Sequence, residues 1–175
     1  GQYDVKEIPG AEGVLYLVRP RGNAAVYIGP VSSDSPQLRV YRAPLDGSAP
    51  PTAVMDFDTS WSWLTEVEGG DILGVRGSNE LVRVPQGGAP TAPVKLDAGR
   101  PGISNYQLWD TLPGGKILTN VVAYDAKGWH YSVGVIDPSS GKVDILVDDG
   151  GNATYSATGH LLFSRGGALL AMPFD

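Results

Sequence analysis

The chain has 175 residues, 42% of them hydrophobic, which is long enough for one sizeable core and short for two domains. Its formal net charge is −6, and Lys and Arg are scattered singly, which disfavours nucleic acid and anionic lipid as partners because both need clustered cations. The absence of cysteine excludes disulfides, thiolate metal sites and a Cys nucleophile, and no apolar run approaches the length of a membrane span.

The N-terminal part of the chain predicts one lone strand followed by a group of four. Residues 3–8 (YDVKEI) alternate in polarity and end at Pro9-Gly10. The group of four is predicted at residues 14–18, 24–28, 37–44 and 52–56. The runs 14–18 and 24–28 are fully apolar, which is typical of strands buried on both faces. Short turns join the four strands and therefore predict a meander.

Three further groups follow with the same spacing and bring the total to about sixteen short strands with almost no helix. The second group begins near residue 60 and continues at 72–76, 80–84 and 93–96. The third is predicted at 105–112, 116–122, 130–136 and 142–147. The fourth is predicted at 153–157, 160–164 and 168–174, and it is one strand short.

A hairpin that recurs along the chain indicates the architecture. Residues 131–147 (YSVGVIDPSSGKVDILV) form an alternating apolar run that breaks at a tight turn, and weaker copies begin at Leu38, Glu80 and Ala168. The period is roughly 40–45 residues, which is typical of a propeller blade. We therefore predict one all-β domain over residues 1–175, a β-propeller of about four four-stranded antiparallel blades at 13–57, 58–98, 102–148 and 151–175.

The incomplete last group leaves two interpretations of the ring open. In one, residues 1–9 supply the missing strand by pairing with 168–174 and close a four-bladed ring, because a bare edge exposes unpaired backbone groups. In the other interpretation, the chain is part of a larger propeller, and its boundary falls between two blades.

The C-terminal turns carry a resemblance to a known family. The stretch TLPGGKILTNV, the turn at 158–161 (TGHL), the turn at 165–167 (RGG) and the end at 172–175 (MPFD) resemble the TolB-like, or WD-like, propeller repeats of bacterial proteins. They are especially similar to the C-terminal extracytoplasmic propeller of bacterial serine/threonine protein kinases. The resemblance covers about residues 37–175 and implies a periplasmic or secreted location in a bacterium. The kinase's own nucleotide and catalytic motifs are absent, so the resemblance concerns a non-catalytic part.

One face of the predicted propeller gathers aromatic and polar side chains. The loops 58–61, 102–106 and 150–152 are expected there, with 124–130 (YDAKGWH) as the longest inner insertion. Rings that stack on apolar surfaces, beside amides and carboxylates that fix orientation, are typical of peptide or sugar binding. The candidate binding residues are Asp58, Trp61, Asn105, Tyr106, Tyr124, Asp125, Trp129, His130 and Asn152.

Several of these residue types also have a structural interpretation. Trp63 and Trp109 are predicted to fill the wedge between blades, and Trp61 has both interpretations. Trp129 lies in a Gly-containing loop and is the best candidate for an exposed binding aromatic. Asp148-Asp149 offers two carboxylates without the further oxygens of a calcium loop, so a solvated turn is predicted, and no metal or other cofactor is expected.

The sequence thus predicts a non-catalytic binding or sensor module that recognises a protein, peptide or glycan partner. A first alternative is a carbohydrate-active enzyme, a lyase or glycosidase, that uses Asp58, Asp125 and His130 at the channel mouth. A second alternative is a structural propeller fragment that associates with copies of itself.

Overall fold

The computed structural model describes residues 7–18 and 23–174 of the chain. Fifteen strands account for all of the regular structure in these ranges, where no helix occurs. In the described part of the chain there is accordingly no helix long and apolar enough to cross a membrane. The predicted all-β class is confirmed, and the fifteen strands observed are close to the sixteen predicted.

The strands form four antiparallel sheets, which we call blades 1 to 4. Blade 1 contains β1 (Tyr16–Val18), β2 (Ala24–Pro30), β3 (Leu38–Pro44) and β4 (Thr52–Phe57). Blade 2 contains β5 (Trp61–Glu66), β6 (Ile72–Arg76), β7 (Glu80–Val84) and β8 (Val94–Lys95). Blade 3 contains β9 (Ile103–Thr111), β10 (Ile117–Asp125), β11 (Gly128–Ile136) and β12 (Val143–Val147). Blade 4 contains β13 (Gly151–Ser156), β14 (His160–Arg165) and β15 (Ala168–Pro173).

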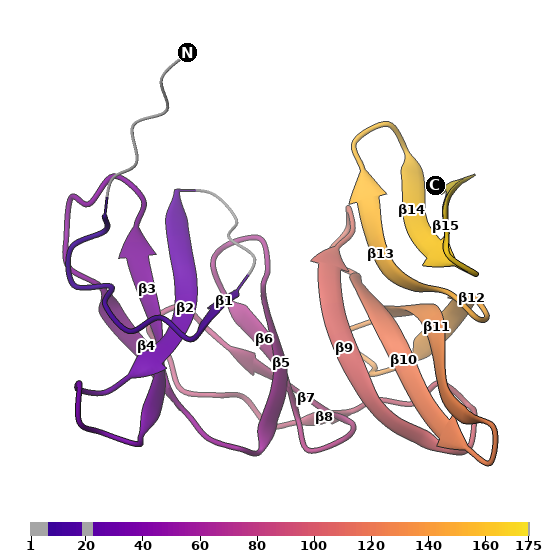
Figure 1. The fold of residues 1–175 in the computed structure, drawn as a ribbon, viewed down its shortest axis with the longest axis horizontal. Helices are drawn as coiled ribbons and strands as arrows, with labels where there is room; N and C mark the ends of the chain where they lie inside the picture. The colour runs from indigo at the N-terminus through magenta and orange to yellow at the C-terminus, as the bar shows by residue number, and fades with distance from the viewer. Residues whose placement is uncertain (1–6, 19–22, 175) are drawn as a thin grey trace.

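Each blade is a meander, because every strand pairs with its neighbour in the sequence. Figure 1 shows the four blades side by side along an arc, with blade 1 at the left and blade 4 at the upper right. The first strands of the blades (β1, β5, β9 and β13) lie on the concave side, and β4, β8, β12 and β15 lie on the outside. The inner strands touch in sequence, since β5 contacts both β1 and β9, and β9 contacts β13.

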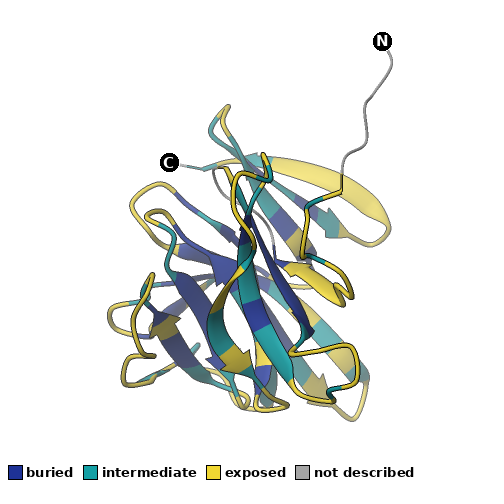
Figure 2. Cartoon of the chain, turned by 90° about the vertical axis from the view of Figure 1, so that its left-hand side faces the viewer, coloured by how far each residue is buried: buried dark blue, intermediate teal, exposed yellow. Residues whose placement is uncertain are grey.

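The core consists of three clusters of buried apolar side chains, one between each pair of successive blades. Val26 and Val40 of blade 1 meet Trp61 and Ile72 of blade 2 in the first cluster. The second cluster joins blades 2 and 3, and the third joins blades 3 and 4. In Figure 2 the buried residues accordingly follow the middle of the strands, whereas the turns are exposed.

Blade 3 buries both faces, which explains the apolar run in β10. Ile117 and Val121 pack in the cluster toward blade 2, while Leu118 between them packs in the cluster toward blade 4. Alternate residues of a strand point to opposite faces, so a strand between two other sheets needs apolar residues at consecutive positions.

Gly74 in β6 shows how one small residue sets the packing of an inner strand. A Cβ at this position would lie 2.6 Å from Leu64 Cδ2 and 2.7 Å from the Trp61 ring. The missing side chain therefore lets the Trp61 ring lie against the backbone of β6, as glycines in strands often do at close approaches.

Blade 4 has three strands, and in the described part of the chain β15 pairs with β14 alone. The predicted closing strand at residues 3–8 falls mostly on residues 1–6, which lie outside the described residues. Glu7 and Ile8 are described and are not in a strand. Closure of the ring by the N-terminal segment therefore stays a prediction.

Candidate functional site

The β10–β11 hairpin of blade 3 extends beyond the strand on its outer side. Each of its strands has nine residues, whereas β12 pairs with Val133–Ile136 of β11 and no further. The hairpin turns at Asp125, whose carboxylate accepts a hydrogen bond from the backbone N–H of Lys127 at 2.7 Å. Gly128, with a φ of 112°, completes the turn in a conformation that side chains disfavour.

This tight hairpin corrects one expectation. Residues 124–130 were predicted as the longest inner insertion, but they are the end of a regular hairpin in which Tyr124 pairs with Trp129 and Asp125 with Gly128. The physical reason is local, because the Asx turn at Asp125 and the glycine at 128 reverse the chain within four residues.

Three exposed aromatic side chains line one face of this hairpin. The Tyr124 and Trp129 rings are neighbours across the two strands, with centroids 4.9 Å apart. Tyr131 is two residues beyond Trp129 and therefore lies on the same face, which continues into Val133 and Val135 of the cluster against blade 4. Trp129 is 60% exposed, Tyr124 58% and Tyr131 42%. The three rings therefore lie on the face of blade 3 that packs against blade 4, beyond the end of the buried core.

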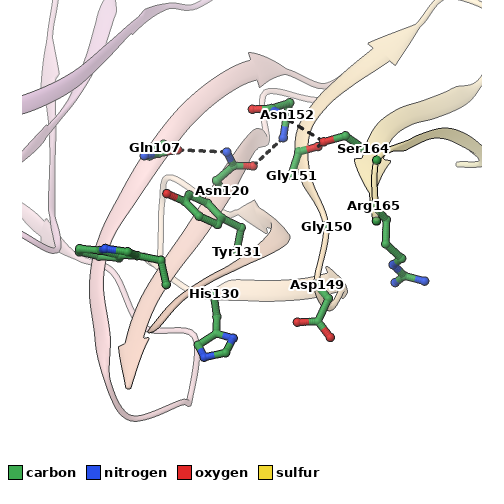
Figure 3. A pocket seen from close by; sticks show the side chains of 13 residues that line it. Gln107, Asn120, His130, Tyr131, Asp149, Gly150, Gly151, Asn152, Ser164 and Arg165 are labelled. Atoms are coloured by element: carbon green, nitrogen blue, oxygen red, sulfur yellow. Dashed lines mark hydrogen bonds between the residues drawn. The ribbon is translucent and has the colours of Figure 1, made fainter. Parts of the chain in front are cut away.

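The space beside these rings is a cleft between blades 3 and 4 with a volume of about 670 Å³ (Figure 3). We call it the interblade cleft. Blade 3 contributes its aromatic wall and two amides, and blade 4 contributes the segment before β13 and the turn between β14 and β15. Its lining residues are Gln107, Asn120, Trp129, His130, Tyr131, Asp149, Gly150, Gly151, Asn152, Ser164, Arg165, Gly166 and Gly167.

A chain of hydrogen bonds forms the floor of the interblade cleft (Figure 3). Asn120, which is 2% exposed, accepts a hydrogen bond from the backbone N–H of Asn152 at 3.0 Å and donates one to Gln107 Oε1 at 3.0 Å. Ser164 Oγ donates to the backbone carbonyl of Gly151 at 3.0 Å, and the Asn152 amide donates to Ser164 Oγ at 3.4 Å. The bond between Asn120 and Asn152 joins the two blades, and the set of bonds holds the amide side chains in place.

The rim of the cleft carries charges of both signs. Arg165 donates a hydrogen bond to the backbone carbonyl of Asp148 at 2.8 Å, and Asp149 has a φ of 55°. The carboxylate of Asp148 pairs with Arg100, and this hydrogen bond is the main reason why its pKa lies below the ordinary value. The cleft is therefore not dominated by one sign of charge.

His130 and Asp125 form a pair at the end of the hairpin. Nε2 of His130 lies 2.8 Å from Oδ1 of Asp125. The hydrogen bond from His130, and then that from the Lys127 N–H, lower the pKa of Asp125 below its ordinary value. Asp125 is thereby kept ionised and bound to its neighbours on the hairpin.

The structure brings several of the predicted binding residues together. Trp129, His130 and Asn152 line the interblade cleft. Tyr124 contacts Trp129, and Asp125 contacts His130, so both belong to the same hairpin end.

Other predicted residues lie elsewhere. Trp61 is 9% exposed and packs in the cluster between blades 1 and 2, so the core interpretation holds for it. Tyr106, which was predicted only as a binding residue, is 2% exposed and packs in the cluster between blades 2 and 3. Tyr106 faces blade 2 because it alternates with Gln107, which faces blade 4. Asn105 is half-buried. Asp58 accepts a hydrogen bond from the Ser60 N–H in the turn between blades 1 and 2, away from the cleft between blades 3 and 4.

Sequence reasoning missed Gln107, Asn120, Tyr131 and Arg165. Asn120 carries a usable signal, because it is an amide inside the mainly apolar run ILTNVV, and buried amides in strands need partners. Gln107 and Tyr131 carry no comparable signal, since their place follows from the register of β9 and β11.

The arrangement offers few groups for chemistry. In residues 7–18 and 23–174, no three His, Cys, Asp or Glu side chains come together as metal ligands. Of the three residues of the enzymatic alternative, His130 lines the cleft and Asp125 is bonded to it, whereas Asp58 lies in the turn between blades 1 and 2. Asp149 is the carboxylate among the lining residues of the cleft. The lining of the cleft thus consists mainly of aromatic, amide and glycine residues.

Comparisons with known proteins agree with the topology. No protein-family model and no curated protein matches the chain. The chain is similar to the solved structure described as "YCF48 bound to D1 peptide", with a TM-score of 0.55 and 18% identity over 95% of this chain and 52% of that one. It is also similar to "Streptogramin B lyase structure", with a TM-score of 0.47 and 13% identity over 94% of this chain and 70% of that one.

The chain therefore spans about half the length of the YCF48 chain that it matches. Both neighbours are β-propeller proteins, and at this level of identity the likeness concerns the fold alone. Together with the four meander sheets, the likeness to the YCF48 structure shows that the described residues have an all-β propeller fold and form four blades.

Proposed function

We propose that the chain is a non-catalytic binding module that recognises a protein partner through a peptide segment seated in the interblade cleft. The observation that carries this proposal is the aromatic wall of Trp129 and Tyr131 above a floor of hydrogen-bonded amides. Large rings that stay exposed beside fixed polar groups are typical of binding surfaces, since they offer apolar contact at a low entropic cost.

The size and composition of the cleft support the same proposal. Its volume of about 670 Å³ falls within the range of small-molecule and peptide side-chain sites. Gly166 and Gly167 leave its blade-4 side open, because a Cβ at either position would meet nothing within 4 Å. A bound chain can therefore continue beyond the cleft on the side of the turn between β14 and β15.

The comparison with solved structures supports a peptide as the ligand class. The YCF48 propeller is described as bound to the D1 peptide, and its fold matches 95% of this chain. A peptide on a propeller of this type is thus a known arrangement, which we extend to this chain as part of the proposal.

Replacing Trp129 by Ala tests the proposal. We expect peptides selected on the wild-type protein from a displayed random library to bind the variant more weakly by about 1–3 kcal/mol, the range of an interface anchor. Because the ring is 60% exposed, the melting temperature should stay close to that of the wild type. Isothermal titration calorimetry measures the first quantity and circular dichroism the second.

Tyr16 provides the matched control, since it is an exposed aromatic residue at 66% exposure on β1 of blade 1. Tyr16→Ala should leave peptide binding unchanged. If no selected peptide distinguishes wild type from Trp129→Ala, or if the selected ligands of a parallel glycan array do so instead, the peptide-binding proposal is wrong.

The finer assignments are also proposals. The turns at 112–115 and 158–161 support a TolB-like type of propeller and, with it, an extracytoplasmic location in a bacterium. Recovery of the native protein in the periplasmic or secreted fraction would support this location, and recovery with cytoplasmic markers would contradict it.

A further inference from the structure

The hydrogen bonds of the cleft floor determine which way its amides point. The backbone N–H of Asn152 can act as a donor alone, so the Asn120 atom that meets it at 3.0 Å is the carbonyl oxygen. The other end of Asn120 is therefore its NH₂ group, which donates to Gln107 Oε1 at 3.0 Å. Gln107 must then turn its own NH₂ group away from Asn120. That nitrogen, Nε2, has no hydrogen-bond partner in the described part of the chain.

The Asn152 side chain is oriented by a second set of bonds. Ser164 has one hydroxyl hydrogen, which it donates to the carbonyl of Gly151 at 3.0 Å. Ser164 Oγ therefore acts as the acceptor for the Asn152 NH₂ group at 3.4 Å. The Asn152 carbonyl oxygen, Oδ1, is left without a partner among the described residues. It lines the same cleft as Gln107.

The floor thus presents one fixed donor and one fixed acceptor. In an extended chain, the N–H and C=O of the same residue point to the same side, which is how two residues of an antiparallel pair exchange both of their hydrogen bonds. A donor at Gln107 and an acceptor at Asn152 match such a residue. Figure 3 shows the Gln107, Asn120 and Asn152 amides along one side of the cleft, with the Tyr131 ring beside them.

We propose that the interblade cleft binds an extended main-chain segment of its partner, in which one residue accepts a hydrogen bond from Gln107 Nε2 and donates one to Asn152 Oδ1. This inference rests on the proposed function and specifies the ligand. An apolar side chain of the segment lies against Trp129. In recognition of this kind, main-chain hydrogen bonds supply affinity and a side-chain contact supplies specificity.

The fixed polarity favours a peptide over a glycan. A sugar hydroxyl both donates and accepts, so it can bind equally well to donors or acceptors and has no need of amides held in one orientation. Arg165 donates one of its N–H groups to the Asp148 carbonyl, so its guanidinium is partly bound within the protein.

Gln107→Glu is the sharpest test, because Glu has the shape of Gln and keeps an oxygen for the Asn120 NH₂ group. It replaces the donor Nε2 by an acceptor, which then faces the carbonyl of the bound segment. Peptides selected on the wild type and dependent on Trp129 should bind this variant at least about tenfold more weakly, as expected when a buried partner is left unpaired. Gln37→Glu, at an exposed position of the β2–β3 turn, controls for the added charge and should bind normally.

A second measurement leaves the protein unchanged. Each residue of a selected peptide is N-methylated in turn, and one position is expected to lose binding at least about tenfold because its N–H can no longer reach Asn152. A peptide that depends on Trp129 but tolerates both Gln107→Glu and methylation at every position overturns this inference and leaves the proposed function standing. Failure to recover any Trp129-dependent peptide overturns both.

Discussion

Asp110 illustrates how one side chain can hold two blades together. It is 8% exposed at the end of β9, and its carboxylate accepts hydrogen bonds from Thr154 Oγ1 at 3.0 Å and from the Tyr155 N–H at 3.3 Å, both on β13. It also accepts one from the Thr111 N–H at 2.9 Å. Asp110 therefore positions blade 4 against blade 3, and with it the far wall of the interblade cleft.

Removing this carboxylate should destabilise the protein. Asp110→Ala removes the acceptor of two hydrogen bonds from blade 4, and we expect the free energy of unfolding to fall by about 1–3 kcal/mol. Urea denaturation measures the loss. Asp144→Ala, at a surface carboxylate with 57% exposure that pairs with Lys142, should change stability by no more than about 0.5 kcal/mol. Equal effects of the two substitutions would mean that Asp110 does not join the blades.

At the scale of the strand, most of the fold is predictable from the sequence because short apolar runs stand between glycine turns. The bounds of β6 (Ile72–Arg76) and β7 (Glu80–Val84) agree with the prediction to the residue. The end of the β10–β11 hairpin is different, since DAKG is a polar stretch that resembles an insertion and becomes a tight turn through the Asp125 side chain.

The candidate site is less predictable than the strands for a related reason. The exposed aromatic and the asparagine can be predicted from their residue types and loop positions, as Trp129 and Asn152 were. Gln107 belongs to the floor because it faces blade 4 rather than blade 2, and Tyr106 is buried because it faces the other way. This difference of one position depends on strand register, which three-dimensional packing decides.

The edge strand β15 has few of the features that usually protect an edge, apart from Pro173 at its end. It pairs with β14 over six residues without a bulge, its sequence ALLAMP contains no charge, and Leu169 is 77% exposed. Unpaired backbone groups beside exposed apolar residues favour pairing with another chain. Among the described residues this edge is unpaired, and we expect the protein to self-associate through it as its concentration rises.

Leu169→Lys should reduce this association, because a lysine on an edge strand opposes pairing with a second edge. Sedimentation velocity over a series of concentrations measures the effect. Leu45→Lys, at a position that is 47% exposed in the β3–β4 turn, is the control and should associate like the wild type. A wild-type protein that stays monomeric over the whole series would contradict the interpretation of β15.

At the scale of the molecule, the four blades place the candidate site where two sheets diverge. The clusters between blades are close-packed along the middle of the strands, but blade 3 has a longer central hairpin than blade 4 can cover. The uncovered end is the aromatic wall of the cleft. The same stacking that produces the arc of blades therefore also produces the candidate site, without a separate structural element.

The central claim, a peptide in the interblade cleft, is tested most directly by a crystal structure of the protein with a peptide selected on it. We predict an extended segment between blades 3 and 4, with a side chain on Trp129 and main-chain hydrogen bonds to Gln107 and Asn152. A peptide bound elsewhere on the propeller, with the Trp129 ring still exposed to solvent, would contradict the account.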